Sequence, residues 1–329
     1  MRKVKKTLIT GINGQDGSYL AELLLNKGYE VHGTIRRTAI ENVNRMVNLN
    51  HIRNKIHLHI CQLDNHLAIY KLIAQIKPDE CYHLAAASFV SYSFEDETSI
   101  INSNFNSTHF LLSSIKELVP DCKVYFAGSS EMFGYALNSP QDENEKFNPR
   151  SIYGISKVAS YHVVKNYRER FNLYTCTGIT YNHESPRRGY AFVTRKITST
   201  VAKIYLGYEK CLELGNVNTQ RDWGYAPEYV EAMWRMLNKT NKPDDYIIAT
   251  GKLHSVKDVL EVAFSSVGLK YESYLKINED FYRPGENIPL AGNCEKIKNA
   301  IGWIAKKSFY EMIQEMVMND IEILRGRNL

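Results

Sequence analysis

The sequence predicts an α/β protein with a doubly wound parallel sheet and a smaller C-terminal domain. Short apolar runs alternate with helical patterns through the first 181 residues, which is typical of parallel strands joined by crossover helices. A glycine-rich turn follows the first of these runs, and the composition changes beyond residue 181. We therefore place a sheet domain at 1–181, with later segments returning to it, and a second domain at 182–329.

The composition is that of an ordinary globular protein, with 44% hydrophobic and 23% charged residues among 329. No stretch approaches the roughly 20 apolar residues of a membrane span, and the apolar run after the basic N-terminus is too short for a signal peptide. We therefore expect a cytoplasmic protein without membrane contact. The six cysteines are scattered, which favours reduced structural thiols over a metal site. The net charge of +5 suits an anionic small ligand rather than a nucleic acid.

The first predicted strand, residues 7–10, runs into a glycine-rich turn and then a helix over 18–27. Glycines after a first strand allow a tight turn and let backbone N–H groups approach a pyrophosphate at the helix N-terminus. The spacing is G-x-x-G-x-x-G. This setting predicts dinucleotide binding in a Rossmann-type fold, and we assign five residues of the turn to the cofactor: Gly11, Gly14, Gln15, Asp16 and Gly17.

The second predicted strand, 29–35, ends in Arg36 and Arg37, where NAD-specific enzymes usually carry an acidic residue. Two guanidinium groups suit a 2′-phosphate, so we favour NADP over NAD. The alternative is that these arginines are surface charge or an inter-subunit contact.

A third strand is predicted at 56–60 by its strict alternation. We interpret His57 and His59 as the polar face of this strand rather than as metal ligands, and we expect no metal site. Asp64, just beyond the strand, is expected near the adenine; an ordinary loop carboxylate is the alternative.

A helix at 67–76 and a fourth strand at 80–84 lead into a run of small residues, 85–88. Small residues let a chain pass close to a cofactor, so Leu84 and Ala86 are assigned to cofactor binding; a tightly packed strand end would look the same. A long helix is predicted at 99–118, before the fifth strand at 123–128.

The fifth strand ends in Ser129 and Glu131, at the edge of the sheet where open α/β sheets bind ligands. Tyr153 and Lys157 follow at the spacing i, i+4, which places both on one face of a helix. An ammonium beside a phenol favours the phenolate, so we expect a lowered pKa for Tyr153 and a role in acid–base chemistry. Taken alone, this spacing also describes many solvated pairs.

A polar loop at 135–150 precedes that helix, and a sixth strand is predicted at 174–181. Basic and polar segments recur afterwards, at 182–189, 194–196, 220–224 and 282–286. Guanidinium groups bind phosphate oxygens in a bidentate way, so these segments are candidates to converge on a diphosphate. Scattered solvated charge is the alternative.

Together the glycine triplet, the Ser129–Glu131 segment and the Tyr153/Lys157 pair resemble the extended short-chain dehydrogenases/reductases. Within them, the strings at 11–20, 182–189, 192–196 and 221–224 are similar to those of the GDP-mannose 4,6-dehydratases, over residues 6 to 325.

The resemblance implies a lyase that binds NADP and a GDP-sugar and makes a 4-keto-6-deoxy sugar by internal hydride transfer. Tyr153, aided by Lys157 and Ser129, would take the C4 hydroxyl proton, and Glu131 the C5 proton. His183 and Arg188 would hold the cofactor. The C-terminal domain would be the main substrate-binding domain. The residues that would hold the substrate are Ser88, Asn182, Lys196, Arg221, Arg283 and Glu286.

The sequence departs from the family pattern at Ala87, Phe89 and Phe133, which replace polar residues expected near the sugar. GDP-N-acetylglucosamine and a GDP-manno-heptose are therefore alternatives to GDP-mannose. An NADPH-dependent reductase or epimerase acting on a GDP-keto-sugar is the rival function within the fold, and a non-catalytic nucleotide-binding protein is the rival outside it. Analogy predicts a homodimer or homotetramer.

Overall fold

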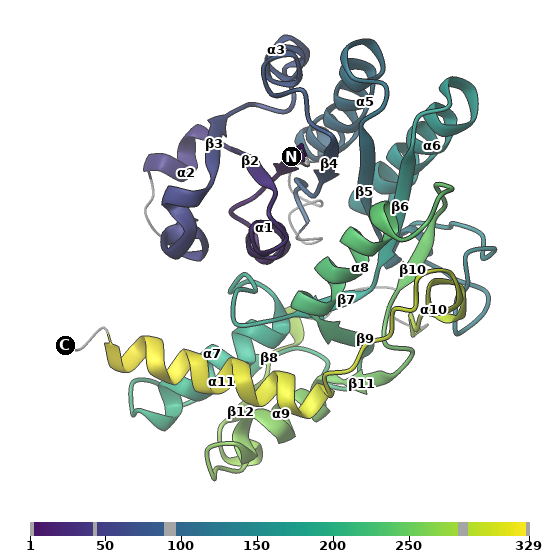
Figure 1. The fold of residues 1–329 in the computed structure, drawn as a ribbon. Helices are drawn as coiled ribbons and strands as arrows, with labels where there is room; N and C mark the ends of the chain where they lie inside the picture. Colours follow the sequence, from purple (N-terminus) through teal and green to yellow (C-terminus); the bar gives the residue numbers. More distant parts are fainter. Residues whose placement is uncertain (1–2, 42–44, 89–96, 282–288, 327–329) are drawn as a thin grey trace.

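The computed structural model describes residues 3–41, 45–88, 97–281 and 289–326, and a seven-stranded sheet lies at its centre (Figure 1). Every strand pairing in this sheet is parallel. The chain winds outward to one edge, returns to the middle and winds outward to the other edge, which confirms the predicted doubly wound topology. From edge to edge the strands are β3 (His57–Ile60), β2 (Glu30–Ile35), β1 (Lys6–Thr10), β4 (Glu80–His83), β5 (Lys123–Ser129), β6 (Thr175–Thr180) and β10 (Tyr246–Ile248).

Helices cover both faces of the sheet (Figure 1). One face carries α3 (His66–Ile76), α5 (Ser107–Leu118) and α6 (Ile152–Phe171), and the other carries α1 (Gln15–Asn26) and α8 (Ala226–Asn238). In α3 the buried residues Ile69, Leu72, Ile73 and Ile76 recur at the spacing that forms one apolar helix face. Its start is fixed by Asn65, whose side chain accepts a hydrogen bond from the Ala68 N–H at 3.0 Å.

The second half of the chain forms its own hydrophobic core below the sheet (Figure 1). Helices α7 (Val193–Tyr205), α9 (Val256–Ser265) and α11 (Phe309–Gly326) pack together there, beside two small sheets. The small sheets contain β7 (Asn182–Glu184), β9 (Gln220–Tyr225) and β11 (Leu253–Ser255), and β8 (Leu212–Leu214) and β12 (Leu275–Ile277). The shorter helical segments are α2 (Arg37–Glu41), η2 (Val47–Lys55), η5 (Ser130–Met132), η6 (Tyr271–Ser273), η7 (Glu279–Phe281) and α10 (Glu295–Ile301). Within the described ranges, no helix combines the length and apolar character needed to span a bilayer.

Segments from beyond residue 181 return to the large sheet. Strand β10 pairs with β6, while α8 packs on α1 and Trp303 belongs to the same core. Strand β10 was not predicted, because a run of three residues is too short to show a period of two. The domain division at 181/182 stays a prediction.

The helix predicted at 99–118 differs from the structure at its start. It consists of α4 (Glu97–Ile101), a π-helical turn, η4 (Asn102–Asn106), and α5. Within the π-helical turn, the buried Asn104 side chain accepts from the Ala87 N–H at 2.9 Å and donates to the Ser156 hydroxyl at 3.1 Å. A π turn within a helix is common near functional sites, and here it ties the loop after β4 to α6.

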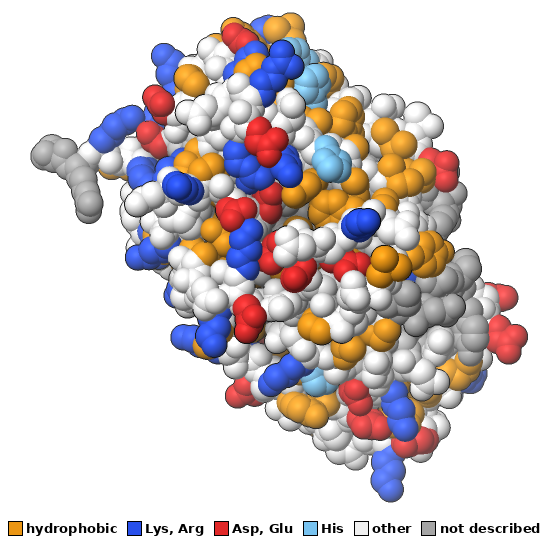
Figure 2. All heavy atoms as spheres, turned by 90° about the vertical axis from the view of Figure 1, so that its right-hand side faces the viewer, with side chains coloured by type: hydrophobic (Ala, Val, Ile, Leu, Met, Phe, Trp, Pro, Cys, Tyr) orange, Lys and Arg blue, Asp and Glu red, His pale blue; other side chains and the backbone are white. Residues whose placement is uncertain are grey.

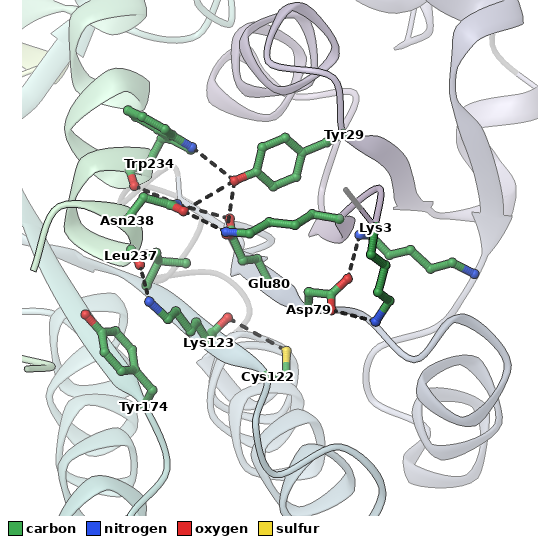
Figure 3. A network of polar contacts seen from close by, with 12 residues as sticks. Lys3, Tyr29, Asp79, Glu80, Cys122, Lys123, Tyr174, Trp234, Leu237 and Asn238 are labelled. Atoms are coloured by element: carbon green, nitrogen blue, oxygen red, sulfur yellow. Dashed lines mark hydrogen bonds and ion pairs between the residues drawn. The ribbon is translucent and has the colours of Figure 1, made fainter. Parts of the chain in front are cut away.

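A polar network at the amino end of the sheet joins β4 to α8 (Figure 3). The Glu80 carboxylate is 1% exposed and accepts from the Lys5 ammonium at 2.7 Å and the Tyr82 hydroxyl at 2.8 Å. The Tyr29 hydroxyl donates to the same carboxylate at 3.0 Å. The Asn238 amide of α8 completes the set at 3.3 Å. Each of these donors satisfies part of a buried charge, so the network depends on this one carboxylate.

We predict that Glu80→Ala lowers the free energy of unfolding by about 1–3 kcal/mol, because it removes the carboxylate and leaves buried donors such as the Tyr82 hydroxyl without an acceptor. Lys3→Ala is the matched control, since Lys3 pairs with Asp79 at 3.2 Å in the same network but is 83% exposed. An exposed pair of this kind contributes less than about 1 kcal/mol. Urea unfolding followed by circular dichroism measures both changes. Equal losses in the two variants would contradict the importance of the Glu80 carboxylate.

Candidate active site

A cavity of about 620 Å³ opens at the carboxyl ends of the parallel strands, between the large sheet and the second half of the chain. This is the edge at which open α/β sheets bind ligands. The predicted site residues that line it come from both halves of the chain: Asp16, Leu84, Ala86, Ser88, Ser129, Glu131, Tyr153, Lys157, Asn182, His183, Arg188, Lys196 and Arg221.

The glycine-rich turn has the shape that a dinucleotide requires. Gly11 has a positive φ of 72°, and a Cβ there would meet the Ala85 backbone at 3.0 Å. A Cβ on Gly17 would lie 2.4 Å from the Gly11 carbonyl oxygen. Gly14 caps α1, so the first N–H groups of this helix follow the turn directly. The backbone therefore fits a phosphate at the helix N-terminus.

Three predicted cofactor residues form one network rather than separate contacts. The His183 Nε2 lies 2.8 Å from the Asp16 carboxylate, and its Nδ1 lies 2.7 Å from the Tyr181 carbonyl oxygen. Burial opposes a charge on His183, but the Asp16 carboxylate raises the pKa of the ring above its usual value. The Gln15 amide donates to the His183 carbonyl at 3.0 Å. These contacts join the glycine-rich turn to β7, and Asp16 and His183 both line the cavity.

The predicted catalytic residues converge from β5 and α6. Ser129 ends β5, and Ser151 caps α6 by accepting from the Gly154 N–H at 3.1 Å. This cap places Tyr153 and Lys157 in the first two turns of the helix, where both are buried. The Lys157 ammonium donates to the Ala127 carbonyl of β5 at 2.7 Å, which fixes the helix against the strand.

The expected lowering of the Tyr153 pKa is not found. Burial raises the pKa of this phenol to about 12, and the hydrogen bond with Ser129 only partly opposes the effect. The Lys157 ammonium lies 5.8 Å from the centre of the Tyr153 ring and is engaged by the strand carbonyl instead. Burial also lowers the pKa of Lys157 to about 8. The prediction was wrong because i, i+4 spacing gives a shared face but not a direct contact.

Glu131 lies in the short helix η5 that follows Ser129. Its backbone N–H donates to the Ser129 hydroxyl at 3.2 Å. The Nε of Arg150 lies 3.8 Å from the Glu131 carboxylate, and both side chains are mostly buried at 11% and 17% exposure. Arg150 directly precedes the Ser151 cap of α6, and Glu131 directly follows β5 in η5, so this pair lies next to the elements that carry Tyr153 and Ser129.

The basic segments of the second half divide into two groups. Lys196 on α7 and Arg221 on β9 line the cavity, and their role in a diphosphate site stays a prediction. Burial lowers the pKa of Lys196. Arg195 instead faces away from the cavity and pairs with the buried Asp320 of α11 at 2.6 Å. For Arg195, the predicted role in a diphosphate site is wrong, because its charge serves packing between α7 and α11.

Several predicted residues lie elsewhere. Arg36 and Asp64 are exposed just after β2 and β3, outside the lining of the cavity. Arg283 and Glu286 lie outside the described residues, as does Phe89. Phe133 is fully buried against Phe147 and Tyr181, with ring centroids at 5.4 and 6.4 Å.

Two of the three altered positions, Phe133 and Ala87, therefore do not line the cavity. Phe133 is part of the core, and Ala87, which is half-buried, does not line the cavity. A substitution pattern alone does not tell which side of a turn faces a ligand.

Two residues of the site were missed in the sequence. Arg150 lines the cavity beside Glu131, and Asn104 positions the loop after β4. Arg150 stands three residues before Tyr153 in the sequence, a position that could have drawn attention to it. Asn104 had no local signal, because its importance comes from the π turn.

Comparisons with known proteins agree with this architecture. The family model described as GDP-mannose 4,6 dehydratase matches residues 8–316. The chain is 42% identical to the GDP-mannose 4,6 dehydratase of Homo sapiens, over 97% of this chain and 92% of that protein. It is 44% identical to GDP-mannose 4,6 dehydratase 1 of Arabidopsis thaliana, over 98% and 91% of the two chains.

Solved structures show the same fold at lower identity. The dTDP-glucose 4,6-dehydratase of Streptomyces venezuelae, solved with NAD and TYD bound, superposes with a TM-score of 0.84 at 19% identity and covers 98% of each chain. At that identity the likeness concerns the fold alone, whereas the family match and the relatives above extend over nearly the whole chain. This protein belongs to the GDP-mannose 4,6-dehydratase family.

Proposed function

We propose that this protein is a nucleotide-sugar 4,6-dehydratase, a lyase that converts GDP-mannose or a close GDP-hexose into its 4-keto-6-deoxy form. The observation that carries the proposal is the Glu131 carboxylate, which lines the same cavity as the Ser129 hydroxyl and the Tyr153 phenol. A reductase needs only the hydroxyl groups, whereas elimination of water needs a second acid–base group. Family membership supports the same activity.

The residues of β5 and α6 would carry out the first half of the reaction, which is the oxidation at C4. Tyr153 would accept the proton of the C4 hydroxyl as a phenolate, so its raised pKa must fall when the cavity is filled, and Ser129 would hold the phenol through their hydrogen bond. Lys157 fixes α6 on β5 and supplies a positive charge beneath the site. The glycine-rich turn, His183 and Arg188 would hold a nicotinamide dinucleotide, which would supply a reversible hydride acceptor, so the cycle would consume no added reductant.

Glu131 would carry out the second half of the reaction, which is the elimination of water across C5 and C6. The carbonyl at C4 acidifies the hydrogen on C5, and the carboxylate accepts that proton. The C6–O bond then breaks, and the same carboxyl delivers the proton to the departing hydroxyl, which leaves as water. Arg150, at 3.8 Å, is the positioning residue that directs this carboxylate. Glu131 therefore serves as base and then as acid. When hydride enters C6, the proton held by Tyr153 would pass to C5, which completes the 4-keto-6-deoxy product and restores both residues.

The two ends of the cavity would hold the two ligands. The glycine-rich turn, Leu84, Ala86, His183 and Arg188 would bind the dinucleotide, and NADP is favoured over NAD because Arg36 follows β2 with an exposed guanidinium. Lys196, Arg221 and Asn182 would bind the GDP group, joined by Arg283 and Glu286 of the undescribed segment. Ser88 would lie at the sugar.

We predict that the purified protein removes one water from GDP-mannose with NADP present and no reductant added. Mass spectrometry should show a product 18 Da lighter, since loss of one water is the only change in composition. NAD, GDP-N-acetylglucosamine and GDP-manno-heptose are tested in parallel. Glu131→Gln should bind the cofactor normally and lose water formation about 10²–10⁴-fold, the usual contribution of a general acid–base.

Turnover of a GDP-keto-sugar with added NADPH, without water loss from any of the three substrates, would favour a reductase. Unchanged turnover in Glu131→Gln would contradict the role of this carboxylate.

We predict that Arg150→Met lowers kcat about 10²-fold with little change in KM, because the base is then held less firmly for the C5 step. Arg150→Lys should recover part of the rate. The isotope effect of a C5-deuterated substrate should rise in Arg150→Met, because the C5 step becomes slower than the steps before it. In a Glu131→Gln background the same change should have almost no further effect. Full additivity of the two substitutions would show that Arg150 acts independently of Glu131.

The surface supports the prediction of a homodimer or homotetramer. Hydrophobic side chains gather on the face shown in Figure 2. Among the large apolar side chains that the described residues expose are Ile101 on α4 and Ile155 and Phe171 on α6, at 38%, 45% and 39%. Light scattering after size-exclusion chromatography should give a mass of two or four times 37.9 kDa. A single chain mass at micromolar concentration would contradict this assembly.

A further inference from the structure

Three histidines and a glutamate face the same side of the edge strands β2 and β3. The strand register pairs His32 with His57 and Thr34 with His59. Because side chains two residues apart on a strand share a face, Glu30 and His32 project with His57 and His59. The order of the large sheet places β3 at its edge beside β2 (Figure 1). The pairing of the strands thus gathers four groups that can bind a metal ion.

We propose that Glu30, His32 and His57 bind a divalent transition-metal ion, with zinc as the best candidate. One ligand atom from each of the three lies within 4.8 Å of the other two. The His32 Nε2 is already 2.8 Å from a Glu30 carboxylate oxygen, and the His32 and His57 rings stack with centroids 4.7 Å apart. Small rotations of the exposed His57 ring would bring the three atoms to the spacing of a metal site.

His59 supplies the partner that a ligating histidine usually has. Its Nε2 lies 3.0 Å from the His32 Nδ1. With a metal on Nε2 of His32, the proton of that ring lies on Nδ1 and is donated to His59. Such a partner fixes the tautomer and the orientation of the ligand. His59 is therefore a positioning residue of the proposed site rather than a ligand.

The donor set indicates which ions fit. Two imidazoles and one carboxylate suit zinc, nickel or copper far better than magnesium or calcium. His57 is exposed and Glu30 is 34% exposed, so water can complete the coordination shell. The Lys6 ammonium, 3.6 Å from the Glu30 carboxylate, competes with the ion for that ligand. We therefore expect moderate affinity and reversible binding.

The position of the site separates it from the reaction. Glu30 and His57 begin β2 and β3, whereas the active-site cavity lies at the carboxyl ends of the strands. A metal here would join the edge strand β3 to β2 and stabilise the sheet without contacting the substrate. In the sequence His57 and His59 were interpreted as a polar face only, because the contribution of Glu30 and His32 depends on the register of the two strands.

Isothermal titration of the full-length protein with zinc chloride, in a buffer that does not bind zinc, tests the proposal. We expect one zinc ion per chain, at least tenfold weaker binding in His57→Ala, and about 10–100-fold weaker binding in His59→Phe. Zinc should also raise the Tm of the wild type, because a ligand that binds the folded state stabilises it. It should not raise the Tm of His57→Ala, which is expected to fold because His57 is exposed.

His51→Ala is the matched control. The His51 ring lies 2.7 Å from the Glu22 carboxylate, but within the described ranges these two residues belong to no group of three possible ligands. Zinc binding should therefore be unchanged in this variant. Unaltered zinc affinity in His57→Ala, or loss of binding in His51→Ala, would overturn the proposed site.

Discussion

The hydrogen bond from the Lys157 ammonium to the Ala127 carbonyl is the contact on which the active site depends. It joins α6 to β5 in a buried position, where burial lowers the pKa of the ammonium to about 8. With the helix fixed to this strand, Tyr153 reaches Ser129 at the end of β5. The Ser151 cap then determines where Arg150 enters the cavity. A change in the distance between strand and helix would disturb all of these groups together.

Some charged residues of this protein line the cavity, and others hold elements of the fold together. The local sequence does not distinguish these two roles. Arg195 with Asp320 and Arg168 with Asp245 form buried pairs, each at 2.6 Å, that hold elements together. Asp222, in the family string at 221–224, accepts from the backbone N–H groups of Thr250 and Gly251 at 2.9 and 2.8 Å. Such residues resist substitution because removing one partner leaves a buried charge unpaired. A specific sequence string therefore need not mark a ligand contact.

The sequence predicted the parts of the fold that depend on local pattern. Six strands and helices between them were found from short apolar runs, alternation and helical periodicity, because these signals lie within a few residues. It missed β10 and the π turn at Asn104, because both are defined by contacts with distant segments. The candidate site likewise contains residues that local pattern predicts and residues whose position depends on packing. The residues at the ends of strands were predicted, whereas the Arg150–Glu131 pair and the position of Phe133 required the packing of α6 on β5.

The identity of the sugar depends on a small part of the cavity. The groups that would carry the chemistry lie on β5, η5 and α6, which are held by caps, strand pairing and the Lys157 contact. The groups that would bind GDP lie on β9 and α7, in the separate core of the second half. Ser88 and Thr180 also line the cavity, and Arg150 lies beside Glu131. If the two groups hold the nucleotide and the reacting carbons, we expect differences among hexoses at other positions to be recognised by such lining side chains. Substitution there can change the accepted sugar while the order of proton and hydride transfers stays the same.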